Sequence, residues 1–193
     1  MLLLSGGMDS IAIAHWIRPR LALTVDYGQV CALAETRAAA QVAGELGISH
    51  STLKVDLTRM GVGRLAGAAP LAMSPTPEWW PFRNQLLVTL AATHAIKSGA
   101  DSVVIGTLST DDAHADGSPD FVKTMDALLR MQEGSIRLIT PALQLDGVEL
   151  ARRSGAPREL LGYAHSCHVS NLPCGRCRGC LKRLDTLSAL GWS

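Results

Sequence analysis

Short apolar runs alternate along this chain with longer stretches in which apolar residues recur at helical spacing. The short runs predict buried strands at residues 2–4, 21–26, 51–57, 102–107 and 136–139. The longer stretches predict helices at residues 11–17, 31–46, 83–97, 145–154 and 157–161, one that begins at residues 118–120, and a short one that includes residues 182 and 183. Strands that alternate with helices are typical of a parallel sheet covered on both faces. We therefore predict an α/β fold with a doubly wound, parallel, five-stranded sheet.

The turn between the first strand and the first helix has the sequence Ser-Gly-Gly-Met-Asp-Ser at residues 5–10. A strand that turns into a helix points backbone N–H groups into the turn, and the helix N-terminus adds partial positive charge there. Gly6 and Gly7 carry no side chain that would keep an anion away. The pattern indicates a cradle for phosphate, although it lacks the spacing and the lysine of a Walker A loop. The alternative is an ordinary turn in which Asp9 or Ser10 caps the helix.

Composition restricts the classes of function. The chain has 193 residues, of which 47% are hydrophobic and 4% aromatic, so it can bury a sizeable core but offers few rings for stacking bases. With 18 basic and 17 acidic residues the formal net charge is +1, which makes nucleic acid an unlikely partner. No apolar run is long enough to span a membrane and no signal peptide is visible, so we expect a cytoplasmic protein. Residues 59–77 are rich in Gly, Ala and Pro, lack a clear period, and predict a long loop.

Four of the five cysteines lie close together near the end of the sequence, with the spacing C-x6-C-x2-C-x2-C. They are Cys167, Cys174, Cys177 and Cys180. Four thiolates at this spacing suit a tetrahedral zinc ion, while disulfides and an iron–sulfur cluster are the alternatives. We expect an α/β domain over residues 1–162 and a zinc-binding segment with a C-terminal helix over residues 163–193. Lys182 and Arg183, just beyond the cysteines, are either solvated helix charges or groups that hold phosphate or a substrate carboxylate.

The motif at residues 5–10 resembles the pyrophosphate loop, or PP-loop, of the N-type ATP pyrophosphatases. These enzymes cleave ATP between its α- and β-phosphates and transfer AMP to an oxygen of the substrate. Together with the cysteine cluster, the motif resembles the QueC family of 7-cyano-7-deazaguanine synthases, over nearly the whole chain. Residues 26–29 (Asp-Tyr-Gly-Gln), residues 81–84 (Pro-Phe-Arg-Asn) and residues 166–180 are similar to further motifs of that family.

The resemblance implies an ATP-dependent C–N ligase with an adenine nucleotide alpha hydrolase-like fold. ATP would adenylate the carboxylate of 7-carboxy-7-deazaguanine, ammonia would convert the adenylate to an amide, and a second activation would dehydrate the amide to the nitrile. The implied cofactors are ATP, Mg²⁺ and Zn²⁺, with zinc on the four cysteines, and the implied assembly is a homodimer. The implied catalytic residues are Asp9, Arg83 and Lys123. The residues implied to bind the nucleotide are Leu4, Ser5, Gly6, Gly7, Met8, Asp9, Ser10, Asp26, Tyr27, Gly28, Gln29, Asn84 and Gly106.

The chain departs from the family pattern at two places beside the expected substrate. Val30 and Cys31 stand where the family has a pair of basic residues. The family also has a characteristic loop at residues 111–120, and of its pattern this chain keeps only an Asp, the Pro-acid-Phe sequence and the overall frame of the loop. QueC-like relatives in anti-phage defence of the CBASS type join the deazaguanine acid to a protein amine, so an amino group of a partner protein is the alternative nucleophile. Two other readings are a non-enzymatic zinc module that binds nucleic acid, and a tRNA thiolation enzyme in which Cys31 would carry sulfur.

Overall fold

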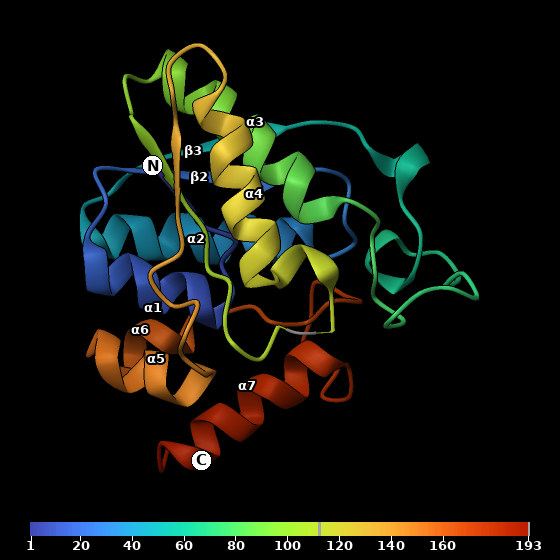
Figure 1. Ribbon diagram of the computed structural model, residues 1–193. Helices are drawn as coiled ribbons and strands as arrows, with labels where there is room; N and C mark the ends of the chain where they lie inside the picture. Colours follow the sequence, from blue (N-terminus) through green and yellow to red (C-terminus); the bar gives the residue numbers. More distant parts are fainter. Residues whose placement is uncertain (112, 193) are drawn as a thin grey trace.

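The sheet places the first turn at the centre of the molecule. The computed structural model describes residues 1–111 and 113–192, and this part contains the strands β1 (Leu2–Leu3), β2 (Leu21–Asp26), β3 (Ser49–Lys54), β4 (Ser102–Val104) and β5 (Arg137–Ile139) (Figure 1). All pair in parallel, in the order β3-β2-β1-β4-β5. The strand order therefore reverses between β1 and β4, and clefts for ligands form at such a point, beyond the carboxyl ends of the strands. The predicted doubly wound parallel sheet is confirmed.

Helices cover both faces of this sheet, and each face has its own apolar core. The helices are α1 (Met8–Ile17), α2 (Ala32–Leu46), α3 (Arg83–Lys97), α4 (Pro119–Arg130), α5 (Gly147–Ser154), α6 (Arg158–Gly162) and α7 (Arg178–Ala189). On one face α1, α2, α5 and α6 pack over Leu2 and Ala22, and on the other α3 and α4 pack over Leu23 and Val25 (Figure 1). Neighbouring strand residues such as Ala22 and Leu23 serve opposite cores because successive side chains point to opposite faces.

Several element boundaries differ from the sequence predictions. Strand β3 covers residues 49–54 instead of 51–57, because it pairs residue for residue with the six residues of β2. Strand β4 ends at Val104, three residues early, and the chain from 105 to 107 lines a cavity instead. Helix α1 begins at Met8 rather than residue 11. The prediction for α3 is confirmed at both ends, and so is the start of α4, where the Ser118 hydroxyl accepts a hydrogen bond from the Phe121 N–H at 3.2 Å.

The segment that follows α6 returns to the first turn. The His165 N–H donates to the carbonyl of Gly6 at 2.9 Å, and the Asn171 side chain donates to the Val30 carbonyl at 3.0 Å and accepts from the Ala34 N–H at 2.9 Å. These contacts hold the cysteine-bearing segment against the first turn and α2, while α7 packs beside α5 (Figure 1). No helix within residues 1–111 and 113–192 combines the length and the apolar character needed to cross a membrane.

Candidate active site

The turn after β1 leaves the N-terminus of α1 open. Gly7 is the N-cap residue, and it provides no side-chain hydrogen bond to the first-turn N–H groups. The alternative in which Asp9 or Ser10 caps this helix is therefore wrong. Gly6 has a φ of 78°, in the left-handed region that favours glycine, and a β-carbon there would collide with the carbonyl of Glu35. The resulting turn is narrow. The Gly7 N–H donates to Ser5 Oγ at 3.3 Å, and the amides of residues 8–10 remain available for an anion.

Beyond this turn lies a cavity of about 340 Å³ at the carboxyl ends of the strands. Most of the predicted nucleotide-binding residues line it. They are Leu4, Ser5, Gly7, Met8, Asp9, Ser10, Tyr27, Gln29, Asn84 and Gly106, and the predicted catalytic residues Asp9 and Arg83 line it as well. Side chains of strands and of α3, including Leu23, Val25 and Val88, make its inner end apolar, as in most small-molecule sites.

Four of the predicted catalytic and nucleotide-binding residues do not line the cavity. Gly6, Asp26 and Gly28 shape the turns around it, and the Asp26 carboxylate accepts a hydrogen bond from the Gly28 N–H at 3.1 Å. Lys123 is exposed on α4 and stands apart from the site, because the buried stripe of that helix carries Val122 and Met125. The structure therefore does not support the predicted catalytic position of Lys123.

A different lysine reaches Asp9. The Lys182 ammonium on α7 lies 3.0 Å from Asp9 Oδ2 and 3.5 Å from Asp111 Oδ1. Burial works to lower the pKa of Lys182, but the two carboxylates together raise that pKa above its usual value. Lys182 is therefore a cation beside the N-terminus of α1. Arg178 and Arg183 from the same helix also line the cavity, so these basic residues belong to the site and are not merely solvated helix charges.

A second group of charges surrounds Arg83 at the start of α3. Burial works to lower the pKa of Arg83, but Tyr27, Asp116 and Glu35 raise it, so the guanidinium keeps its charge. Tyr27 packs edge-on against Trp80, with ring centroids 4.9 Å apart, and burial raises the pKa of its hydroxyl. Trp79 and Trp80 both line the cavity. This end of the cavity thus pairs aromatic walls with a fixed positive charge.

The altered loop is tied directly to this second group. The Asn84 N–H donates to Asp116 Oδ2 at 3.1 Å, and the Asn84 side chain donates to the Asp116 carbonyl, also at 3.1 Å. Asp116 therefore satisfies an open N–H at the start of α3. Asp112, another residue of the altered loop, lies outside the described residues.

The half-buried Glu35 and the buried Cys31 form a hydrogen-bonded pair behind the first turn. The Glu35 carboxylate accepts from the Gln29 amide at 2.8 Å and from the Cys31 thiol at 3.3 Å, and burial raises the pKa of Glu35. Cys31 is fully buried, and burial also raises the pKa of its thiol. Because a nucleophilic cysteine needs access and a low pKa, this position does not fit a sulfur carrier.

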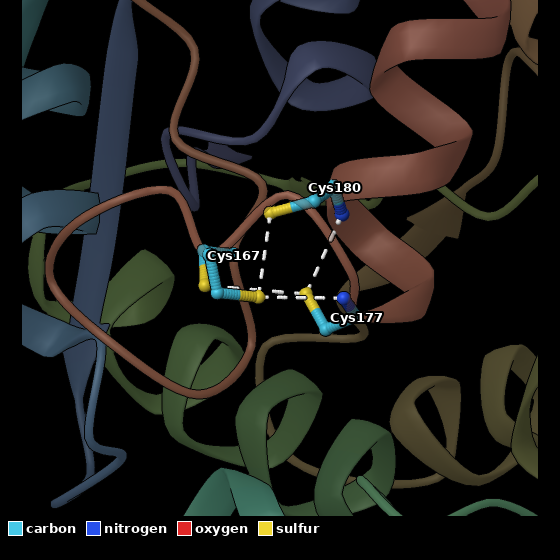
Figure 2. Close-up of side chains that lie close together, drawn as sticks. Cys167, Cys177 and Cys180 are labelled. Atoms are coloured by element: carbon cyan, nitrogen blue, oxygen red, sulfur yellow. Dashed lines mark hydrogen bonds between the residues drawn. The ribbon is translucent and has the colours of Figure 1, made fainter.

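The four C-terminal cysteines converge on one point. Their sulfurs all lie within 4.8 Å of one another, with 3.9 Å between Cys174 and Cys180 and 3.9 Å between Cys167 and Cys177. Figure 2 shows Cys167, Cys177 and Cys180 with their sulfurs turned toward one another. A single tetrahedral zinc ion with bonds of about 2.3 Å requires sulfurs about 3.8 Å apart, so the spacing fits one ion. All five cysteines are free thiols, which excludes the disulfide alternative in this structure.

Backbone N–H groups donate to two of the four sulfurs, those of Cys174 and Cys177. The Cys177 N–H donates to Cys174 Sγ at 3.3 Å, and the Cys180 N–H donates to Cys177 Sγ at 3.5 Å. Such bonds from Arg176 and Cys177 lower the pKa of Cys174 to about 6, whereas burial raises the pKa of Cys180 to about 12. The cluster also positions α7, because Cys177 is the N-cap residue of that helix. The metal ligands and the cavity cations Arg178 and Lys182 therefore belong to one local structure.

Comparison with known proteins agrees with this geometry. The family model described as "Queuosine biosynthesis protein QueC" matches residues 1–191. The chain belongs to the QueC family. Its relatives include proteins named 7-cyano-7-deazaguanine synthase from Methanosarcina barkeri, 28% identical over 98% of this chain and 93% of that protein, and from Desulforudis audaxviator, 33% identical over 96% and 94%. As a member of the QueC family, the chain is an ATP-dependent enzyme.

Solved structures with the same fold are PP-loop proteins. The U34-tRNA thiolase NcsA from Methanococcus maripaludis, solved with its [4Fe-4S] cluster, has a TM-score of 0.58 at 17% identity and is matched over 98% of this chain and 64% of that one. The NMN synthetase of Francisella tularensis has a TM-score of 0.53 at 17% identity, over 100% of this chain and 76% of that one. At these identities the likeness concerns the fold alone.

Sequence reasoning missed several residues of the cavity wall. Glu35, Glu78, His114 and His168 all line the cavity. Glu35 lies in the first turn of the helix that follows the Asp-Tyr-Gly-Gln motif, so its position offered a signal. Glu78 and His114 lie in segments without a regular period, where sequence alone gives no direction for a side chain.

Proposed function

We propose that this enzyme uses ATP to adenylate the carboxylate of 7-carboxy-7-deazaguanine, and that ammonia then converts the adenylate through the amide to 7-cyano-7-deazaguanine. The observation that carries the proposal is the open N-terminus of α1, which faces a cavity that also holds Asp9, Lys182 and Arg83. Family membership and the names of the relatives supply the substrate.

Different residues of the site would carry out different parts of the adenylation step. The amides of residues 8–10 and the dipole of α1 would hold the departing pyrophosphate, because the N-terminus of a helix favours negative charge. Lys182 would neutralise part of this charge and offset the repulsion between the carboxylates of Asp9 and Asp111. Arg83 would orient the substrate carboxylate for attack on the α-phosphorus of ATP, while the aromatic wall of Trp79 and Trp80 would cover the planar ring.

Two metals complete the proposal. Asp9 would hold Mg²⁺, which when bound neutralises phosphate charge; a carboxylate that lines the cavity is a suitable ligand for it. The four cysteines would hold Zn²⁺, whose role here is structural, because the cluster fixes the start of α7 and thereby the position of Lys182. A cytoplasmic homodimer and a division at residues 162 and 163 remain predictions.

A protein amine as the nucleophile is the second candidate, and an open groove beside the cavity favours it. The groove runs between α7, the start of α5 and residues 75–78, and six of its residues also line the cavity. Ammonia needs no such surface, whereas a polypeptide end does. In this form the adenylated acid would be joined to an amino group of a partner, as in QueC-like anti-phage defence.

One reaction separates these candidates. The enzyme is incubated with ATP, Mg²⁺, 7-carboxy-7-deazaguanine and ammonium, with and without the products of genes adjacent to its own, and all products are followed by mass spectrometry. Nitrile formation supports the first candidate, and a deazaguanine-sized mass added to a protein supports the second. Failure to form any adenylate, amide or nitrile, with no protein labelled, contradicts both.

A further inference from the structure

Glu78 is a buried acidic residue without a protein partner. The residue is 8% exposed, and carboxylates at that degree of burial are normally paired, because removal from water disfavours the charge. Across residues 1–111 and 113–192, no ion pair or side-chain hydrogen bond engages its carboxylate. Glu78 lines the cavity, so a ligand that enters the cavity can supply the partner that the protein does not.

Glu78 lies where the cavity and the groove meet. The residues that line both the cavity and the groove are Thr76, Glu78, Asp111, Arg178, Lys182 and Thr186. Two of these carry carboxylates, and Asp111 is already engaged: it accepts from the Leu108 N–H at 3.0 Å and faces Lys182 at 3.5 Å. Glu78 is thus the free carboxylate at the opening between the groove and the cavity.

We propose that Glu78 binds the attacking amine in its ammonium form and accepts one of its protons. This role rests on the proposed function, which requires an amine to reach the acyl-adenylate. Ammonia and primary amines are mostly protonated at neutral pH, as the lysine pKa of about 10.4 illustrates, and the protonated form has no lone pair with which to attack. The cations Arg178 and Lys182 line the same opening and would repel an ammonium ion, and a carboxylate there offsets that repulsion.

The step balances as a proton transfer followed by acyl transfer. An N–H bond of the ammonium breaks, and its proton goes to the Glu78 carboxylate. The freed lone pair forms the C–N bond at the acyl carbon, and the C–O bond to AMP breaks, with AMP leaving with the electron pair. The nitrogen then releases a second proton to water, which leaves a neutral amide. Ammonia and a protein amine satisfy this scheme equally.

A comparison of two nucleophiles tests the role of Glu78. Ammonium must lose a proton before it attacks, whereas hydroxylamine is largely uncharged at neutral pH and traps acyl-adenylates as hydroxamates. Full-length Glu78→Gln and Glu78→Asp variants are assayed with each, and the adenylation half-reaction is measured separately as substrate-dependent exchange of pyrophosphate into ATP. The matched control is Glu133→Gln, because Glu133 is exposed and distant in sequence from every residue of the cavity wall.

We expect Glu78→Gln to lose activity with ammonium but not with hydroxylamine. Glu78→Gln should lower kcat/KM for ammonium about 100-fold, the usual contribution of a general base, while pyrophosphate exchange and the rate with hydroxylamine stay within about twofold of the parent. Glu78→Asp should recover part of the ammonium rate, and Glu133→Gln should match the parent. An equal loss with both nucleophiles, or an unchanged ammonium rate, overturns the role of Glu78. If the parent enzyme exchanges no pyrophosphate into ATP, the proposed function is wrong, and the role of Glu78, which rests on it, is wrong as well.

Discussion

Replacement of Lys182 by methionine should damage both stability and adenylation. Methionine keeps the apolar stem but removes the cation between Asp9 and Asp111. The two carboxylate oxygens that face Lys182 then lie at most about 6.5 Å apart, the two measured distances laid end to end. At an effective dielectric constant of about 20, two negative charges at that separation repel each other by about 2.5 kcal/mol.

Solvent reduces this figure. The three side chains keep 35%, 27% and 35% of their surface exposed, so we expect a loss of about 1–2 kcal/mol in the free energy of unfolding after screening. For a chain of this size that corresponds to a fall in Tm of about 2–8 °C. A divalent cation should raise the Tm of Lys182→Met more than the Tm of the parent, because the cation can replace the missing positive charge between the two carboxylates.

The assay pairs calorimetry with pyrophosphate exchange. Exchange that depends on 7-carboxy-7-deazaguanine should fall about 100-fold in Lys182→Met, as expected when one charged group that stabilises a transition state is lost. Lys123→Met is the matched control, because Lys123 is exposed on α4 and outside the cavity, and it should behave like the parent. Full exchange and an unchanged Tm in Lys182→Met, or the larger loss in Lys123→Met, would refute this reasoning.

Three further predictions concern the metal, the buried thiol and the first turn. Purified protein should contain one zinc ion per chain by elemental analysis. Cys177→Ser should lose this zinc, whereas Cys31→Ser should keep it. Full zinc content in Cys177→Ser would contradict the four-thiolate site. Because burial raises the pKa of the Cys31 thiol, that group should stay protonated and resist alkylation at pH 8 until the protein unfolds, as peptide mass spectrometry can show; rapid labelling of the folded protein would argue against the burial described. Gly6→Ala should lower ATP affinity at least about tenfold by calorimetric titration, since its φ of 78° and its contact with the Glu35 carbonyl exclude a β-carbon, while Gly44→Ala, at an open helix position, should bind ATP normally.

Local motifs explain which parts of this structure the sequence could predict. The turn at residues 5–10 and the cysteine spacing are short-range patterns whose chemistry follows from the residues themselves, and both are where the pattern places them. Helix α3 was equally clear, because its apolar period runs from the Arg83 motif to a glycine just past its end. The ends of β3 were not predictable from its own residues, because the length of β2 determines them.

A similar physical reason explains why the prediction named Lys123, which lies outside the cavity. The resemblance implied a catalytic role for Lys123 and the sequence left the role of Lys182 open; both lie on helices, and only the packing of each helix decides which one faces Asp9. The cysteine cluster fixes the start of α7 locally, but the contact of α7 with α5 joins segments that are distant in sequence, and the sequence does not show it. Glu78 follows a segment without a regular period, so the sequence gives no sign that this residue is buried.

Substrate-dependent pyrophosphate exchange tests the central claim most directly. The claim is that the open turn at residues 5–10 holds the leaving pyrophosphate while a carboxylic acid is converted to its acyl-adenylate. The parent enzyme should exchange labelled pyrophosphate into ATP only when 7-carboxy-7-deazaguanine is present, and Asp9→Ala should reduce this exchange at least about 100-fold. Release of ADP and phosphate instead of AMP and pyrophosphate, or equal exchange in Asp9→Ala, would contradict the account.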